Sequence, residues 1–115
     1  MIPSTWTPYV REYDGELLGY LRREVGGTVP LTLFGYPLAE ASEPDDAVWV
    51  LETRGLACLA GRWRLRTDDG REVPVLILSA YPDGVHVAQA DFGFVAPDSE
   101  RFTVPVPADG RLLPG

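Results

Sequence analysis

The chain has 115 residues, of which 45% are apolar, and this is enough for one ordinary hydrophobic core and a single domain over residues 1–115. The formal charge of −7 comes from 10 basic and 17 acidic residues with no basic block, so the overall charge disfavours nucleic acid and anionic membranes as partners. The single cysteine, Cys58, excludes an internal disulfide.

Composition also bears on source and compartment. Lysine and asparagine are absent, which indicates a gene rich in G/C codons, as in many bacteria. The first residues lack a basic stretch followed by an apolar one, and no apolar run approaches the length of a membrane span. We therefore expect a soluble, cytoplasmic protein with no membrane partner.

The first strong turn signal is Asp14-Gly15, which lies between two alternating segments and is typical of a two-residue type I′ hairpin. Such a turn pairs Tyr9 with Tyr20. Pro8 cannot donate a ladder hydrogen bond, so we expect the first strand at a sheet edge. The predicted core face then carries Trp6, Val10, Leu17, Gly19 and Leu21, and the opposite, exposed face carries Tyr9, Arg11, Tyr13, Leu18, Tyr20 and Arg22.

The segment from Pro30 to Glu40 is too apolar for a plain loop. We interpret it as a crossover that fills the core. The alternative is a lid over a ligand cavity, which Phe34 or Tyr36 would line.

A helix is predicted near residues 43–55. Ser42 followed by Asp45 resembles a capping box, and Pro44 is tolerated in a first helical turn. The predicted helix ends or bends at Gly55. A strand through residues 48–50 is the alternative, because valine and tryptophan favour strands. The buried stripe would hold Ala47, Val48, Leu51, Gly55, Cys58 and Leu59, leaving Trp49, Val50 and Leu56 outside it.

Two more hairpins share the strand from Arg71 to Ala80. Turns at residues 67–70 and 81–84 are both typical of a type I turn followed by a left-handed glycine. The first turn places Leu65 opposite Val73, and the second places Ala80 opposite His86. Because the shared strand is apolar on both faces, we expect it at the centre of a sheet. One face collects Trp63, Leu65, Val73, Val75, Ile77 and Val87, and the other collects Leu76, Leu78, Ala88, Ala90 and Phe92.

A last strand from Arg101 to Val106 is predicted at a second edge, because prolines stand at 105, within it, and at 107, just after it. The predicted class is α+β: a strongly bent antiparallel sheet, or a small partly open β-barrel, of five to seven strands with one helix. An all-β barrel is the alternative.

The sequence contains no arrangement typical of catalysis. The predicted register points the only histidine, His86, away from Ser79, which excludes a nucleophile–base pair. The Asp45-Asp46 and Asp68-Asp69 pairs are accounted for by a helix start and a turn. Gly26-Gly27 lacks the rest of a phosphate-binding motif. We expect no enzyme, no metal and no cofactor.

Two groups of residues are candidate binding sites. The first, here called the Tyr/Arg face, combines stacking rings with planar donors, which are enriched in binding hot spots and on single-strand-binding surfaces. The second is the Arg stripe, three alternating arginines that would contact phosphates or an acidic partner, with Glu72 opposite one of them. The Tyr/Arg face is Tyr9, Arg11, Tyr13, Tyr20 and Arg22; the Arg stripe is Arg62, Arg64 and Arg66.

These patterns lead us to expect a non-enzymatic binding or protein-interaction domain, with a homodimer as one form of the interaction. The apolar residues left outside the helical stripe, Trp49 and Leu56, support an association surface. A small barrel that binds single-stranded nucleic acid and a small-molecule-binding domain are the alternatives.

Overall fold

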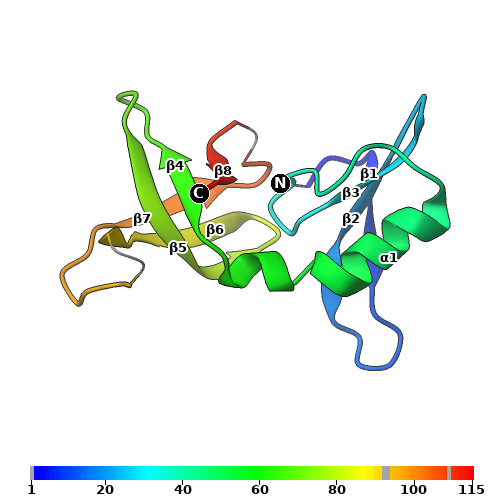
Figure 1. Ribbon diagram of the computed structural model, residues 1–115, viewed down its shortest axis with the longest axis horizontal. Coiled ribbons are helices and arrows are strands. Elements are labelled where there is room, and N and C mark those ends of the chain that lie inside the picture. The colour runs from blue at the N-terminus through cyan, green and yellow to red at the C-terminus, as the bar shows by residue number, and fades with distance from the viewer. Residues whose placement is uncertain (1, 92–93, 109) are drawn as a thin grey trace.

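The computed structural model describes residues 2–91, 94–108 and 110–115, in which two antiparallel sheets lie side by side along the long axis (Figure 1). The first sheet has the order β1-β2-β3, with β1 (Trp6–Val10), β2 (Leu17–Glu24) and β3 (Gly27–Leu31). The helix α1 (Pro44–Arg54) and the 3₁₀ turn η1 (Ala57–Ala60) follow. The second sheet has the order β7-β6-β5-β4-β8, with β4 (Trp63–Arg66), β5 (Glu72–Tyr81), β6 (Gly84–Gln89), β7 (Arg101–Pro105) and β8 (Leu112–Pro114).

The α+β class is confirmed, and the predicted single bent sheet or partly open barrel is wrong. Eight strands fall into two separate sheets within the described residues, which exceeds the predicted five to seven, and the sheets do not close into a barrel. The reason is that α1 and the crossover stand between β3 and β4, so these two strands do not pair. The all-β alternative fails with the presence of α1.

A continuous hydrophobic core joins the two sheets through the crossover. Phe34 is fully buried, and its ring meets that of Trp63 edge-on at 4.9 Å. Tyr36 also contacts Trp63, at 5.4 Å between ring centroids, and the carbonyl of Phe34 accepts a hydrogen bond from Ala108 at 3.0 Å. The prediction that residues 30–40 contain a core-filling crossover is confirmed for this stretch.

The predicted register of the first hairpin is wrong, by two residues beside the turn and by one residue at Tyr9. Gly15 is the last residue of a four-residue loop, because its N–H bonds to the carbonyl of Arg11 and the N–H of Arg11 bonds to Glu16. A bulge at Leu18 follows, and Tyr9 pairs with Gly19 instead of Tyr20. Since side chains alternate along a strand, this shift places Tyr9 and Tyr20 on opposite faces of the sheet.

Gly19 explains why the bulge is tolerated there. Its φ of +153° lies in a region that L side chains avoid, and a Cβ would stand 2.2 Å from the carbonyl oxygen of Leu31 and 3.0 Å from Leu51. Helix α1 therefore packs directly on the backbone of β2. The predicted edge position of β1, which contains Pro8, is confirmed.

The helix is confirmed over Pro44–Arg54, and it stops at Gly55. The predicted capping box is wrong: the cap residue is Glu43, without a side-chain capping bond. Ser42 is held one residue earlier, because its N–H and carbonyl both pair with the backbone of Thr28. Ala47 and Leu51 face the sheet as predicted.

The second sheet follows the sequence pattern in part. The β4–β5 register is confirmed, with Leu65 opposite Val73. The β5–β6 register is wrong: Tyr81 pairs with Gly84 around a two-residue loop, which places Ala80 opposite Val85 instead of His86, and a bulge at Leu78 shifts the pairing by one residue more. β5 is central and β7 is an edge strand, as predicted. Phe92, predicted on the outer face, lies outside the described residues, and β8 was not predicted.

Candidate functional site

The Tyr/Arg face does not exist as one surface. Tyr20 is 3% exposed and packs on Trp6, with 5.5 Å between ring centroids, in the core between the sheets. Burial raises the pKa of Tyr20 above its ordinary value. Arg22 is half-buried at the margin of this core and forms an ion pair with Glu24 at 2.6 Å.

The other members of the Tyr/Arg face lie apart from Tyr20. Tyr13 is 81% exposed in the β1–β2 loop, where the guanidinium of Arg11 lies 4.7 Å from its ring centroid. Arg11 also pairs with Asp14 at 2.7 Å, and this contact lowers the pKa of the Asp14 carboxyl. At this loop tip the charges of Arg11 and Asp14 therefore neutralise each other.

Tyr9, on strand β1, lies beside helix α1, near Glu52. Partial desolvation and the nearby carboxylate of Glu52 raise the pKa of Tyr9. Trp49 is three residues before Glu52 on the same helix and is 63% exposed. The sequence pattern already placed Trp49 outside the buried stripe of the helix. It did not predict that Tyr9 lies near Glu52, because that depends on the register of β1.

The Arg stripe is exposed on one face of β4, yet two of its members are engaged. Glu72 accepts from Arg64 at 2.5 Å and from Arg66 at 3.4 Å, as the pairing of β4 with β5 requires. Arg64 Nε also donates to the carbonyl of Pro114 at 3.1 Å. Arg62 makes no side-chain hydrogen bond or ion pair with the described residues.

His86 lies in a row with Ser79 and Thr103 across three strands, which corrects the argument that its register separates it from Ser79. The bulge at Leu78 brings these two residues opposite each other. The Nδ1 of His86 is 3.1 Å from Thr103 Oγ1, and the Tyr81 ring stands edge-on to it at 5.9 Å. No hydrogen bond joins Ser79 to His86 in the part of the chain that the structure describes.

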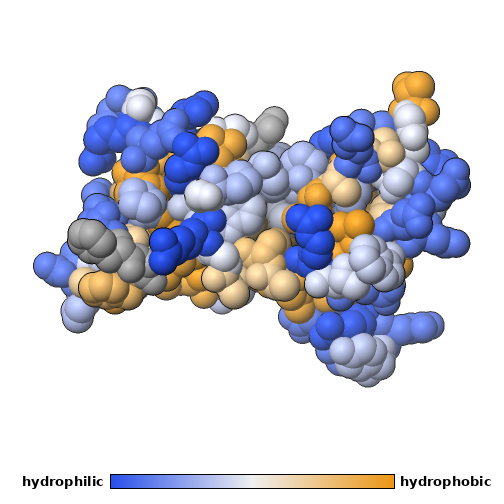
Figure 2. Space-filling view, viewed as in Figure 1, coloured by the Kyte–Doolittle hydropathy of each residue, from blue (hydrophilic) through white to orange (hydrophobic). Residues whose placement is uncertain are grey.

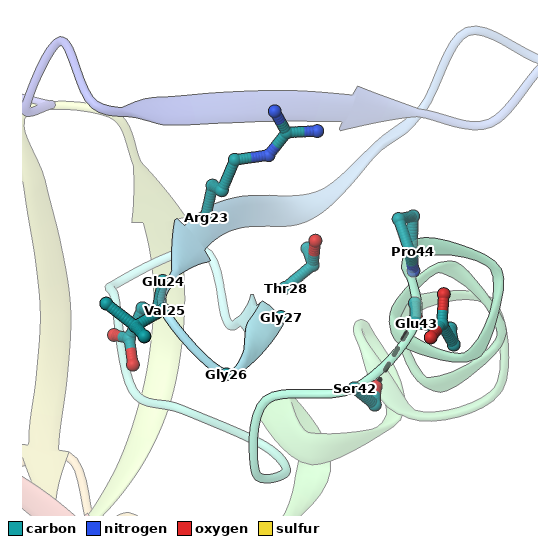
Figure 3. Close-up of a pocket in the computed structure, with 9 residues that line it drawn as sticks. All are labelled: Arg23, Glu24, Val25, Gly26, Gly27, Thr28, Ser42, Glu43 and Pro44. Carbon is teal, nitrogen blue, oxygen red and sulfur yellow. Dashed lines mark hydrogen bonds between the residues drawn. The ribbon is translucent and has the colours of Figure 1, made fainter.

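A pocket of about 540 Å³ is an open hollow between the β2–β3 turn and the start of α1 (Figure 3). The side chain of Thr28, only 7% exposed, points between Arg23 and Pro44. Glu24 and Glu43 line the same hollow, so Arg23 does not give it a net positive charge. The Gly26-Gly27 pair lies at its floor, where Gly27 allows the backbone of Ser42 to approach closely.

A smaller pocket of about 230 Å³ opens on the outer face of the second sheet. Arg62 and Arg64 stand at its rim, and Pro74, Leu76 and Ala90 supply apolar lining. The alternating arginines in the sequence predicted a candidate site on this strand. The pocket itself could not be predicted, because it forms where β4, β5 and the end of β6 lie together.

Cys58 is half-buried under the core and does not resemble a reactive thiol. Its Sγ donates a hydrogen bond to the carbonyl of Gly55 at 3.1 Å, and burial raises the pKa of the thiol to about 11. A thiol with a raised pKa forms little thiolate at neutral pH.

Comparison with protein-family models, curated proteins and solved structures finds no match to this chain. Among the described residues, no three histidine, cysteine, aspartate or glutamate side chains gather as a metal site would require. Helices capable of crossing a membrane are likewise not found in the described ranges.

Proposed function

We propose that the chain is a non-enzymatic protein-interaction module that binds a basic partner protein through the outer surface of α1. This surface, called the helix outer face, is defined by Trp49 and Leu56 with an acidic rim of Asp45, Asp46 and Glu52. The observation that carries the proposal is the exposure of Trp49 among three carboxylates that form no ion pair with a described residue.

Trp49 supplies the apolar centre of the helix outer face. Its position on the helix is nearly opposite the buried residues Ala47 and Leu51, so the ring is turned toward solvent. Leu56 lies seven residues further along a backbone that stays helical through Gly55, and therefore on the same side. An exposed tryptophan is expensive to leave in water, and tryptophan is enriched at the centre of protein interfaces.

The acidic rim determines the sign of the charge expected on the partner. Asp45, Asp46 and Glu52 lie four before, three before and three after Trp49, so all are its neighbours on the helix surface. None of the three forms an ion pair with a described residue. Hydrophilic residues cover the outer end of α1 in Figure 2. Charge complementarity therefore favours arginine or lysine around an apolar contact on the partner.

A second copy of the chain fits this face poorly. A symmetric dimer would bring the same carboxylates against one another, and each copy carries a formal charge of −7. The proposed partner is consequently a different, basic protein. Size-exclusion chromatography with light scattering tests this point. If the protein is a dimer and Trp49→Ala makes it a monomer, the partner at the helix outer face is a second copy of the chain and not a basic protein.

Acrylamide quenching of tryptophan fluorescence tests the main proposal, because Trp49 is exposed while Trp6 and Trp63 are buried. The probe is a designed amphipathic helical peptide with a leucine face and arginine flanks. We expect it to protect Trp49 from quenching and to bind more weakly as salt rises. A peptide with glutamate in place of arginine, and polylysine without apolar residues, are the control ligands.

Substitutions separate the helix outer face from general charge attraction. Trp49→Ala and Asp46→Arg are expected to weaken peptide binding about tenfold or more, since hot-spot truncations cost about 2 kcal/mol or more. Tyr13→Ala, at an equally exposed but distant ring, is the matched control and is expected to bind normally. Equal binding by the Trp49 and Tyr13 variants, or no binding of the arginine peptide, would refute the proposal.

A further inference from the structure

We infer that the pocket on the outer face of the five-stranded sheet binds a small amphipathic acid, an aromatic or short aliphatic monocarboxylate. This pocket, called the Arg62 pocket, is defined by Arg62, Arg64, Pro74, Leu76 and Ala90. It lies on a different sheet from the helix outer face and does not depend on the proposed interaction function.

The floor of the Arg62 pocket suits an apolar group. Ala90 is 5% exposed, and Leu76 lies beside it on the strand that runs through the centre of the sheet. The N–H of Ala90 donates to the carbonyl of Pro74 at 2.9 Å, and proline itself has no N–H. The floor therefore presents hydrocarbon without a free backbone donor, which favours an apolar ligand body over a sugar or a peptide backbone.

The rim supplies one uncommitted cation. Arg64 is turned to Glu72 and to the carbonyl of Pro114, so its guanidinium is largely engaged. Arg62 has no such side-chain partner among the described residues, and only its backbone carbonyl is used, by the N–H of Gly115 at 2.9 Å. A planar guanidinium beside an apolar floor is the geometry that binds a carboxylate through two parallel hydrogen bonds.

Local charge and size both restrict the ligand. The three arginines at positions 62, 64 and 66 outnumber the carboxylates beside them, which are the side chain of Glu72 and the chain end at Gly115 that also lines the pocket. This region is therefore positive on a chain that is negative as a whole. A closed apolar cavity of about 150 Å³ holds benzene. The Arg62 pocket, at about 230 Å³, has room for one ring or a short chain together with a carboxylate.

Amide chemical-shift mapping with benzoate and hexanoate as probes tests the inference. We expect saturable shifts at residues 62, 76 and 90, with affinity in roughly the millimolar range for ligands of this size. Benzyl alcohol keeps the ring without the charge, and acetate keeps the charge without the ring. Both are expected to bind at least tenfold more weakly than benzoate, because each makes only half of the contacts.

Two substitutions examine the two halves of the site. Arg62→Ala is expected to weaken benzoate binding about tenfold or more, since a charged hydrogen bond is lost, and Arg62→Lys is expected to restore only part of it. Leu76→Gln changes the floor at a half-buried position and is expected to weaken benzoate more than acetate. Arg71→Ala removes an exposed arginine that pairs within its own turn, and it is the matched control.

The outcomes are distinct. A variant with two residues added after Gly115 moves the terminal carboxylate from the rim and is expected to bind benzoate at least as well as the original chain. Shifts that do not saturate, equal binding of benzyl alcohol, or unchanged affinity in Arg62→Ala would each overturn the inference.

Discussion

Replacing Tyr20 with alanine tests whether this ring belongs to the core, as the observed register requires. The ring is 3% exposed and packs on Trp6. Removing roughly 150 Å² of buried apolar surface at about 25 cal/mol per Å² costs about 4 kcal/mol. Truncations of buried aromatic residues fall in the same range, about 3–5 kcal/mol. Tyr20→Ala is thus expected to lose a large share of the total stability of a small domain.

The assay is urea unfolding followed by circular dichroism, with thermal unfolding as a second readout. Tyr13→Ala is the matched control, because the same substitution at an 81% exposed ring is expected to change stability by less than about 0.5 kcal/mol. Tyr20→Phe keeps the ring and removes a hydroxyl that bonds no described residue, so a change below about 1 kcal/mol is expected. For Tyr20→Ala the midpoint of thermal unfolding should fall by roughly 15 °C.

The reasoning fails if Tyr20→Ala and Tyr13→Ala have equal effects. That result would mean that Tyr20 lies on the surface with Tyr9, as a two-residue turn at Asp14-Gly15 predicts. If Tyr20→Ala does not fold at all, the stabilities of Tyr20→Phe and Tyr13→Ala at alkaline pH still show whether the Tyr20 ring is buried. Burial raises the pKa of Tyr20, so the unfolded state ionises first and stability falls as pH rises above about 10. Tyr20→Phe should remove part of that fall, and Tyr13→Ala should not.

Three further predictions follow from single contacts. Gly19→Ala should destabilise the protein by several kcal/mol in urea unfolding, since its Cβ would meet the carbonyl of Leu31 at 2.2 Å. Gly70→Ala, with no atom within 4 Å of its Cβ, should cost only the strain of its positive φ, about 1 kcal/mol. Equal losses of stability would argue against the close approach of β3 to Gly19. The pKa of the Cys58 thiol is raised from 9.0 to about 11, so stability should fall as pH rises through this interval. Cys58→Ala should remove that part of the dependence of stability on pH. Rapid reaction of the native thiol with a disulfide reagent at pH 8 would contradict its burial. Glu72→Gln should lower the free energy of unfolding by no more than about 1 kcal/mol, because the ion pairs of Glu72 with Arg64 and Arg66 are partly exposed. The loss should shrink in high salt. A salt-independent loss of several kcal/mol would contradict this expectation.

The sequence by itself determined features that depend on neighbouring residues. Pro44 near the start of a segment with a buried stripe and Gly55 at its end predict α1 almost to its bounds. The turn at residues 67–70 predicts the β4–β5 register, because Gly70 takes the left-handed conformation and no tertiary contact acts against it. Pro8 similarly predicts an edge strand. In each case the local backbone preference and the tertiary structure agree.

Tertiary structure alone decided the two other registers and, with them, the candidate sites. Asp14-Gly15 favours a two-residue turn locally, but the bulge at Leu18 lets Gly19 lie against the backbone of β3 and under Leu51. This packing turns Tyr20 into the core and Tyr9 toward α1, and no pattern within the hairpin reveals it. A side-chain period of two makes every face assignment depend on a single residue of register. The Arg62 pocket has the same origin, because its floor and rim come from strands that only the assembled sheet brings together.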